Sequence, residues 1–169
     1  MMLSHTDDAA RGRRCALQRR TRNIICIWVI FGGLVNFLVY TVIYAELGGD
    51  AKNGWKDTTA RDENGNPSPQ YYISGHFLRA VEGRDRPVPK WVWAYSYIHS
   101  ISLWPTQGLM VICMLILARP HIIATMTEGS WIRGPTFITV VITLTAVLCS
   151  ALTILFTIQF LRDLLYAPT

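Results

Sequence analysis

The sequence predicts an all-α membrane protein with three transmembrane helices and a long extramembrane loop between the first and the second. Of the 169 residues, 51% are hydrophobic, and they gather in three blocks instead of recurring at the helical period of a soluble bundle. Each block lacks charged residues and is long enough to cross about 30 Å of hydrocarbon at about 1.5 Å of rise per residue. The uncharged blocks are 23–44, 91–118 and 135–161.

The alternative class is a soluble helical bundle with unusually apolar helices. A soluble helix needs a polar stripe that faces water, and none of the blocks has a charged face, so we favour the membrane class. The first block is also longer than the apolar core of an ordinary signal peptide, which has about 7–15 residues. We expect this block to remain attached as a signal anchor.

Residues 1–22 form a basic N-terminal tail that determines the predicted topology. Basic residues beside a span are retained on the cytoplasmic side, so the tail and the connection 119–134 are expected inside. The loop 48–90 and the C-terminal tail 162–169 are then outside. The basic tail also accounts for the net charge of +5. We therefore expect the tail to contact anionic lipid, and we expect no nucleic-acid partner. The tail contains Arg11, Arg13, Arg14, Arg19, Arg20 and Arg22.

The first span is predicted at 23–47 and ends where two glycines permit the left-handed conformation that terminates helices. Inside it, Gly32 and Gly33 leave a notch at mid-depth, and Asn36 lies one turn on from Gly32. We expect a neighbouring helix to approach closely at this notch.

The loop 48–90 is predicted to be an ordered cap with little regular structure. Turn-forming residues fill 62–69, and the aromatic run 70–73 after them favours a short strand. The acidic residues of the loop lack the spacing of an EF-hand, so we expect a solvated acidic surface and no metal site. These acidic residues include Asp50, Asp57, Asp62 and Glu63.

The second span belongs to the segment 91–118, which opens with an aromatic girdle typical of the headgroup region. Crossing is expected to start near Tyr97, and Pro105 is expected to kink the helix. The girdle consists of Trp91, Trp93, Tyr95 and Tyr97.

His99 is the one candidate cofactor contact. It shares a predicted polar stripe with Tyr95, Ser102 and Thr106, and an ionisable group inside a span is a functional candidate. An imidazole can ligate the metal of a haem or a chlorophyll-type pigment, hydrogen-bond a quinone, or move protons. The alternative is structural, with neighbouring hydroxyl groups satisfying the ring. No cofactor is required by the sequence.

The third span is predicted at 135–161 and carries a seven-residue repeat of small, mostly hydroxyl side chains. Such a repeat keeps one face toward a partner and permits close approach plus interhelical hydrogen bonds of about 0.6 kcal/mol each. We call this face the threonine seam and predict that it packs against another helix of this chain, a second copy or another protein. Its members are Thr136, Thr139, Thr143, Ala146, Ser150, Thr153 and Thr157.

Catalytic signatures are absent from the sequence. It contains no HExxH, GxSxG or Walker motif, the blocks 23–44, 91–118 and 135–161 contain no Asp, Glu, Lys or Arg, and its four cysteines have no metal-ligand spacing. An enzyme would require His76, Tyr71, Tyr72 and an acid to converge at the membrane surface. We favour a non-enzymatic protein.

A resemblance covers residues 48–108, which contain Gly48-Gly49-Asp50-Ala51, Asn53-Gly54, Tyr71-Tyr72 and Tyr95-Ser96, followed by His99 and Pro105. In these residues the chain resembles a group of small bacterial membrane proteins that carry no assigned function. The resemblance implies a bacterial inner-membrane setting, and a functional unit made of the exterior loop and the start of the second helix. It implies no catalytic residue.

Together these patterns predict an accessory or assembly subunit of a larger membrane complex that docks through the third helix and covers its partner with the loop. The alternative is a subunit of an electron-transfer complex whose haem, pigment or quinone contacts His99.

Overall fold

The computed structural model describes residues 3–62, 64–75, 85–126 and 133–165, with side chains from residue 17 onward. Within these ranges, all three helices are long and apolar enough to cross a membrane, which confirms the predicted fold class. The loop between the first two also contains a small sheet. The elements are α1 (Leu3–Leu47), β1 (Asp50–Asp57), β2 (Gln70–Ser74), β3 (Arg86–Val88), α2 (Lys90–Thr125) and α3 (Gly134–Leu165).

Helix α1 has 45 residues and starts at Leu3, so it includes most of the segment that the sequence analysis assigned to a polar tail. The segment contains no proline, and extending an existing helix adds one hydrogen bond for each further residue that is fixed. The candidate span within α1 is Leu17–Leu47. The basic stretch is therefore a helical extension of the first span.

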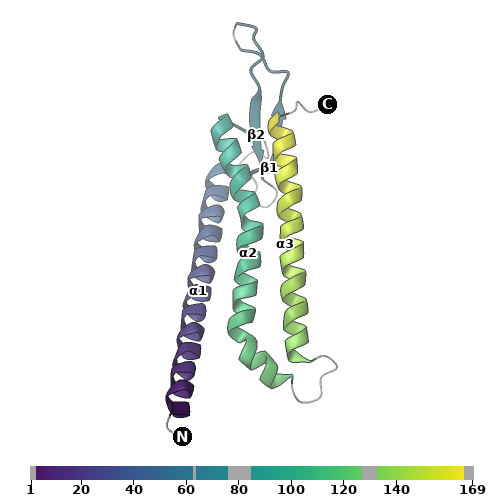
Figure 1. Cartoon of the computed structure of the whole chain (residues 1–169). Coiled ribbons are helices and arrows are strands. Elements are labelled where there is room, and N and C mark those ends of the chain that lie inside the picture. Colours follow the sequence, from purple (N-terminus) through teal and green to yellow (C-terminus); the bar gives the residue numbers. More distant parts are fainter. Residues whose placement is uncertain (1–2, 63, 76–84, 127–132, 166–169) are drawn as a thin grey trace.

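Helix α2 lies beside both α1 and α3 and runs antiparallel to them (Figure 1). The C-terminal ends of α1 and α3 and the N-terminal end of α2 therefore meet at the same end of the bundle, where the sheet lies. We call this the sheet end. Helix α2 continues through Pro105 and Pro120 and bends toward its C-terminal end in Figure 1, as expected where a proline removes a backbone hydrogen bond.

The sheet is antiparallel, with β2 between β1 and β3. The strand expected at 70–73 is present as β2, whereas β1 has no alternating apolar pattern that would announce it. Its backbone passes so close to β2 that a Cβ atom on Gly54 would lie 1.9 Å from the carbonyl oxygen of Tyr72. Only glycine permits this approach.

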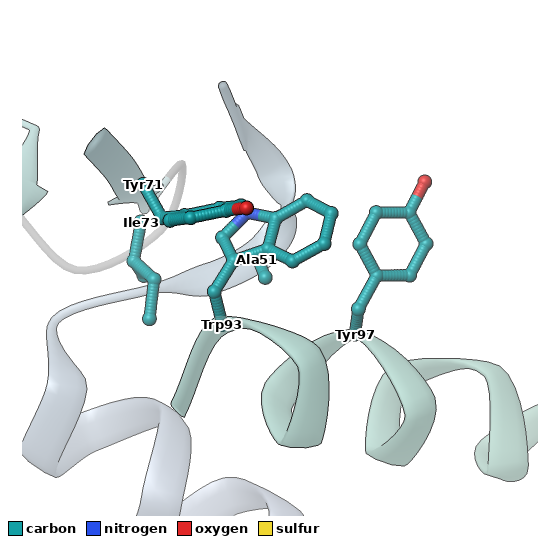
Figure 2. Close-up of a cluster of buried hydrophobic side chains, with 5 residues drawn as sticks. All are labelled: Ala51, Tyr71, Ile73, Trp93 and Tyr97. Atoms are coloured by element: carbon teal, nitrogen blue, oxygen red, sulfur yellow. The ribbon is translucent and has the colours of Figure 1, made fainter. Parts of the chain in front are cut away.

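A hydrophobic core fastens the sheet to the helices. Trp93 and Tyr97 of α2 are each 1% exposed and point toward the sheet (Figure 2). Phe160 of α3 closes the cluster, with its ring centroid 5.1 Å from that of Tyr97. Burial of each large side chain contributes about 1.5–3 kcal/mol. The core consists of Ala51, Tyr71, Ile73, Trp93 and Tyr97.

Candidate functional site

After α1 the chain turns back into the bundle. Gly48 has a φ of 76°, the left-handed conformation that ends a helix, and the N–H of Gly49 donates to the carbonyl of Tyr44 at 3.0 Å. A Cβ atom on Gly49 would lie 2.3 Å from the carbonyl carbon of Ser74, so the turn also packs tightly against the end of β2. As a result, the first residues of β1 contact α1 and α2.

Asp50, the first residue of β1, is 4% exposed and lies between α1 and α2. Tyr40 Oη donates to Asp50 Oδ2 at 2.9 Å, and the backbone N–H of Asn53 donates to Oδ1 at 3.0 Å. Ser100 Oγ lies 3.2 Å from Oδ2 and 3.0 Å from the carbonyl of Ser96, and it has one hydrogen for these two acceptors. Every donor to the carboxylate is electrically neutral.

Lys52, two residues further along β1, carries a positive charge to the same end of the bundle. Its Nζ lies 3.6 Å from the ring centroid of Phe156 on α3 and 5.9 Å from that of Trp104 on α2. The two rings stack on each other with centroids 5.7 Å apart. A cation over such rings gains electrostatic attraction from their negative faces.

A cavity of about 240 Å³ lies between these groups, and both Asp50 and Lys52 line it. Within the described part of the chain, neither of them forms an ion pair. Sequence reasoning placed Asp50 on a solvated surface, because nothing in the local pattern shows that the loop turns back between the helices. The lining residues are Phe37, Tyr40, Asp50, Lys52, Ser100, Leu103, Trp104 and Gln107.

Two other acidic residues named in the sequence analysis, Asp57 and Asp62, lie farther along the loop. Asp57 accepts hydrogen bonds from the hydroxyl and the backbone N–H of Thr59, and these bonds lower the pKa of its carboxyl. Asp62 accepts from the backbone of its own turn, and Glu63 lies outside the described residues. The residues that the structure describes contain no group of three His, Cys, Asp or Glu placed to hold a metal.

His99 is 9% exposed. Its ring lies edge-on between those of Tyr40 and Tyr95, with centroids 5.6 Å away in both cases. Its Nδ1 is buried and has no hydrogen-bond partner in the described structure. A haem, pigment or quinone would therefore have to reach the other nitrogen, Nε2, and cofactor contact stays a prediction.

The threonine seam lies mostly on the exposed surface of α3. Five members are exposed, and Thr153 and Thr157 are half-buried. The face toward α2 instead includes Cys149, close to Gly108, and Phe156, stacked on Trp104. The exposed members are Thr136, Thr139, Thr143, Ala146 and Ser150.

One side of the seam borders a groove between α2 and α3. The groove has a volume of about 420 Å³. Ala146, Ser150 and Thr153 contribute to its α3 wall, and Pro105 and Leu109 contribute to its α2 wall. Three seam hydroxyls donate to carbonyls of their own helix, so they do not need a partner to satisfy them. These are Thr139, Thr153 and Thr157.

Only some of the residues predicted to form the glycine notch of α1 face α2. A Cβ atom on Gly33 would lie 2.3 Å from Met110 Sδ, whereas one on Gly32 would meet nothing within 4 Å. Asn36 Nδ2 lies 3.1 Å from Thr106 Oγ1 and 3.4 Å from Ser102 Oγ. Gly33 and Asn36 therefore join α1 to α2, and Gly32 points away.

The predicted aromatic girdle divides into two pairs. Trp91 is 72% exposed and Tyr95 is 48% exposed, and their headgroup position stays a prediction, whereas Trp93 and Tyr97 belong to the core under the sheet. The enzyme alternative required Tyr71, Tyr72 and His76 to converge. Tyr71 is part of the core under the sheet. Tyr72 stacks on Trp55 at a centroid distance of 4.3 Å, and His76 lies outside the described residues.

No family model, no curated protein and no solved structure matches this chain.

Proposed function

We propose that this protein is a non-enzymatic accessory or assembly subunit of a larger complex in the bacterial inner membrane. The observation that supports the proposal is the groove between α2 and α3, which the threonine seam borders and which no described part of this chain fills. In this proposal the occupant is one apolar transmembrane helix of a partner protein.

The lining of the groove favours a helix as its occupant. Small side chains at Ala146 and Ser150 let a second backbone approach closely, which is the main source of affinity between helices in lipid. Because the hydroxyls of Thr153 and Thr157 are already bonded to their own helix, the contact relies on packing more than on new hydrogen bonds.

The proposed orientation has the N-terminus in the cytoplasm and the sheet end outside. The basic residues of α1 that support it lie in the half of the helix away from the sheet, and the side chains of Arg19, Arg20 and Arg22 are exposed. Retention of such residues on the cytoplasmic side supports this orientation. The sheet then covers the outer surface of the partner.

The test fills the groove without changing the rest of α3. Ala146→Leu places a large side chain in the groove, and Ala151→Leu makes the same change at an exposed position that does not line it. Each variant is purified from native membranes in mild detergent, and the proteins that accompany it are quantified by mass spectrometry.

We expect one stoichiometric membrane protein to accompany the wild type and Ala151→Leu, and to fall about tenfold or more with Ala146→Leu, because overpacking costs about 1–3 kcal/mol. The same protein in equal amount with all three forms would refute docking at this groove. A wild type that purifies only as a single-chain monomer would refute the accessory role.

A further inference from the structure

The cavity at the sheet end is lined by two opposite charges that do not neutralise each other. The Asp50 carboxylate is buried and receives hydrogen bonds only from neutral groups. The Lys52 ammonium lies on the ring of Phe156. Buried charges in proteins are almost always paired, and here neither the buried Asp50 nor the partly buried Lys52 has an ionic partner in the described structure.

We propose that this cavity binds a zwitterionic group that consists of a primary ammonium and a phosphate on a short linker, as in a phosphoethanolamine headgroup. The ammonium lies against Asp50 and the phosphate against Lys52. This binding site is separate from the α3 groove, so it stands whether or not the proposed docking is correct.

The hydrogen-bonding capacity of Asp50 favours a primary ammonium. A carboxylate has about four lone-pair sites, and three neutral donors lie within 3.2 Å of this one, from Tyr40, Ser100 and the backbone of Asn53. One site remains for a donor from the cavity. A primary ammonium supplies both that hydrogen and the missing positive charge, whereas a quaternary ammonium has no hydrogen to donate.

The part of the lining that includes Lys52 favours an anion. Lys52 supplies a positive charge there, and the amide of Gln107 is a further donor among the lining groups. Phosphate oxygens accept from both kinds of group. An anion alone would leave the charge of Asp50 unpaired, and a cation alone would leave that of Lys52 unpaired.

Two features favour a lipid as the source of this group. The cavity volume of about 240 Å³ is below the range of about 300–1,000 Å³ typical of sites for drug-sized ligands, which suits a headgroup. Phe37 and Leu103 lie on spanning helices and line the cavity, and Phe37 is half exposed. Acyl chains extend from the headgroup along this surface of α1 and α2.

The experiment uses the full chain in mild detergent and native mass spectrometry. Phosphatidylethanolamine, phosphatidylcholine and phosphatidylglycerol with identical acyl chains are titrated separately, and the bound lipid per chain is counted. The variants are Asp50→Asn and Lys52→Gln. The matched control is Lys56→Gln on the same strand, whose ammonium lies near the carbonyl of Asp163 and outside the cavity.

We expect the wild type and Lys56→Gln to bind one phosphatidylethanolamine about tenfold more tightly than either other lipid, because hydrogen bonds to charged groups are the strong ones. Asp50→Asn should remove this preference, because only the group that meets Asp50 differs among the three lipids. Lys52→Gln should weaken the binding of all three lipids by a similar factor, because each of them carries the phosphate. Lys52 takes no part in the Tyr40–Asp50 hydrogen bond, so Lys52→Gln decides the question even if Asp50→Asn fails to fold.

Unchanged affinity of Lys52→Gln for phosphatidylethanolamine would overturn the proposal. Equal binding of phosphatidylglycerol would also overturn it, because Lys52 alone would then hold an anion. Free phosphoethanolamine added as a competitor distinguishes the sources. Displacement of the lipid at a similar concentration identifies the soluble zwitterion as a sufficient ligand, and absence of displacement at that concentration identifies the membrane lipid.

Discussion

Tyr40 donates a hydrogen bond of 2.9 Å to Asp50 and so ties the last turns of α1 to the first residue of the returning strand. The two residues are ten positions apart in the chain, and the turn at Gly48 and Gly49 brings them together. This bond holds the start of β1 between α1 and α2. The charged cavity at the sheet end depends on it.

Replacing Tyr40 by Phe should therefore loosen β1. The substitution removes a hydrogen bond to a carboxylate, and bonds to charged groups contribute about 1.5–3 kcal/mol. We expect the free energy of unfolding in mixed detergent micelles to fall by about that amount. Tyr95→Phe is the matched control, because the Tyr95 hydroxyl makes no hydrogen bond in the described structure. Equal losses in the two variants would show that the Tyr40–Asp50 bond does not stabilise the fold.

The sheet should detach when its main anchor is removed. Trp93 is 1% exposed and its ring contacts those of Tyr71, Tyr97 and Phe160. Trp93→Ala should destabilise the protein by about 3–5 kcal/mol, the usual cost of emptying an aromatic site. It should also speed proteolysis of the loop. Trp91→Ala, at a site 72% exposed, should change neither measurement by a comparable amount, and equal effects would contradict the core described here.

The adjacent glycines of α1 should respond differently to a large side chain. Gly33→Leu places carbon atoms where Met110 of α2 lies, whereas Gly32→Leu points away from the bundle. Overpacking costs about 1–3 kcal/mol. Thermal unfolding in detergent should show a loss for Gly33→Leu and little change for Gly32→Leu. The reverse order would mean that α1 is rotated relative to α2.

Cysteines on α1 and α2 offer a direct test of that packing. The buried thiols of Cys26 and Cys113 lie close to each other, whereas Cys149 of α3 lies beside Gly108. A membrane-permeant oxidant should join Cys26 to Cys113 in one disulfide. Counting thiols with a maleimide-coupled polymer should then show two fewer labels in the wild type.

The cross-linking controls are Cys26→Ser and Cys149→Ser. Cys26→Ser should abolish the oxidant-dependent loss of labels, because it removes one of the two partners. Cys149→Ser should preserve that loss. An oxidant-dependent loss of labels that persists in Cys26→Ser would contradict the proximity of Cys26 on α1 to Cys113 on α2.

The sequence alone determined the three membrane-spanning helices and one strand of the loop. Runs of uncharged residues longer than the hydrocarbon thickness have few alternatives to a spanning helix, and the run 70–73 is a local β pattern. The glycine notch could also be predicted, because a glycine has no side chain and so leaves space on the helix surface. Which of the two glycines faces α2 depends on the rotation of the helix about its axis.

Only the tertiary structure decided which polar groups meet. Asp50 and Lys52 lie in a loop with the composition of a solvated surface, and their burial follows from the turn at Gly48 and the anchoring of the sheet on Trp93. These contacts join residues far apart in the chain, and no local sequence pattern predicts them. The division of the aromatic girdle has the same cause, because the sequence pattern of large aromatic side chains does not show which of them the sheet buries.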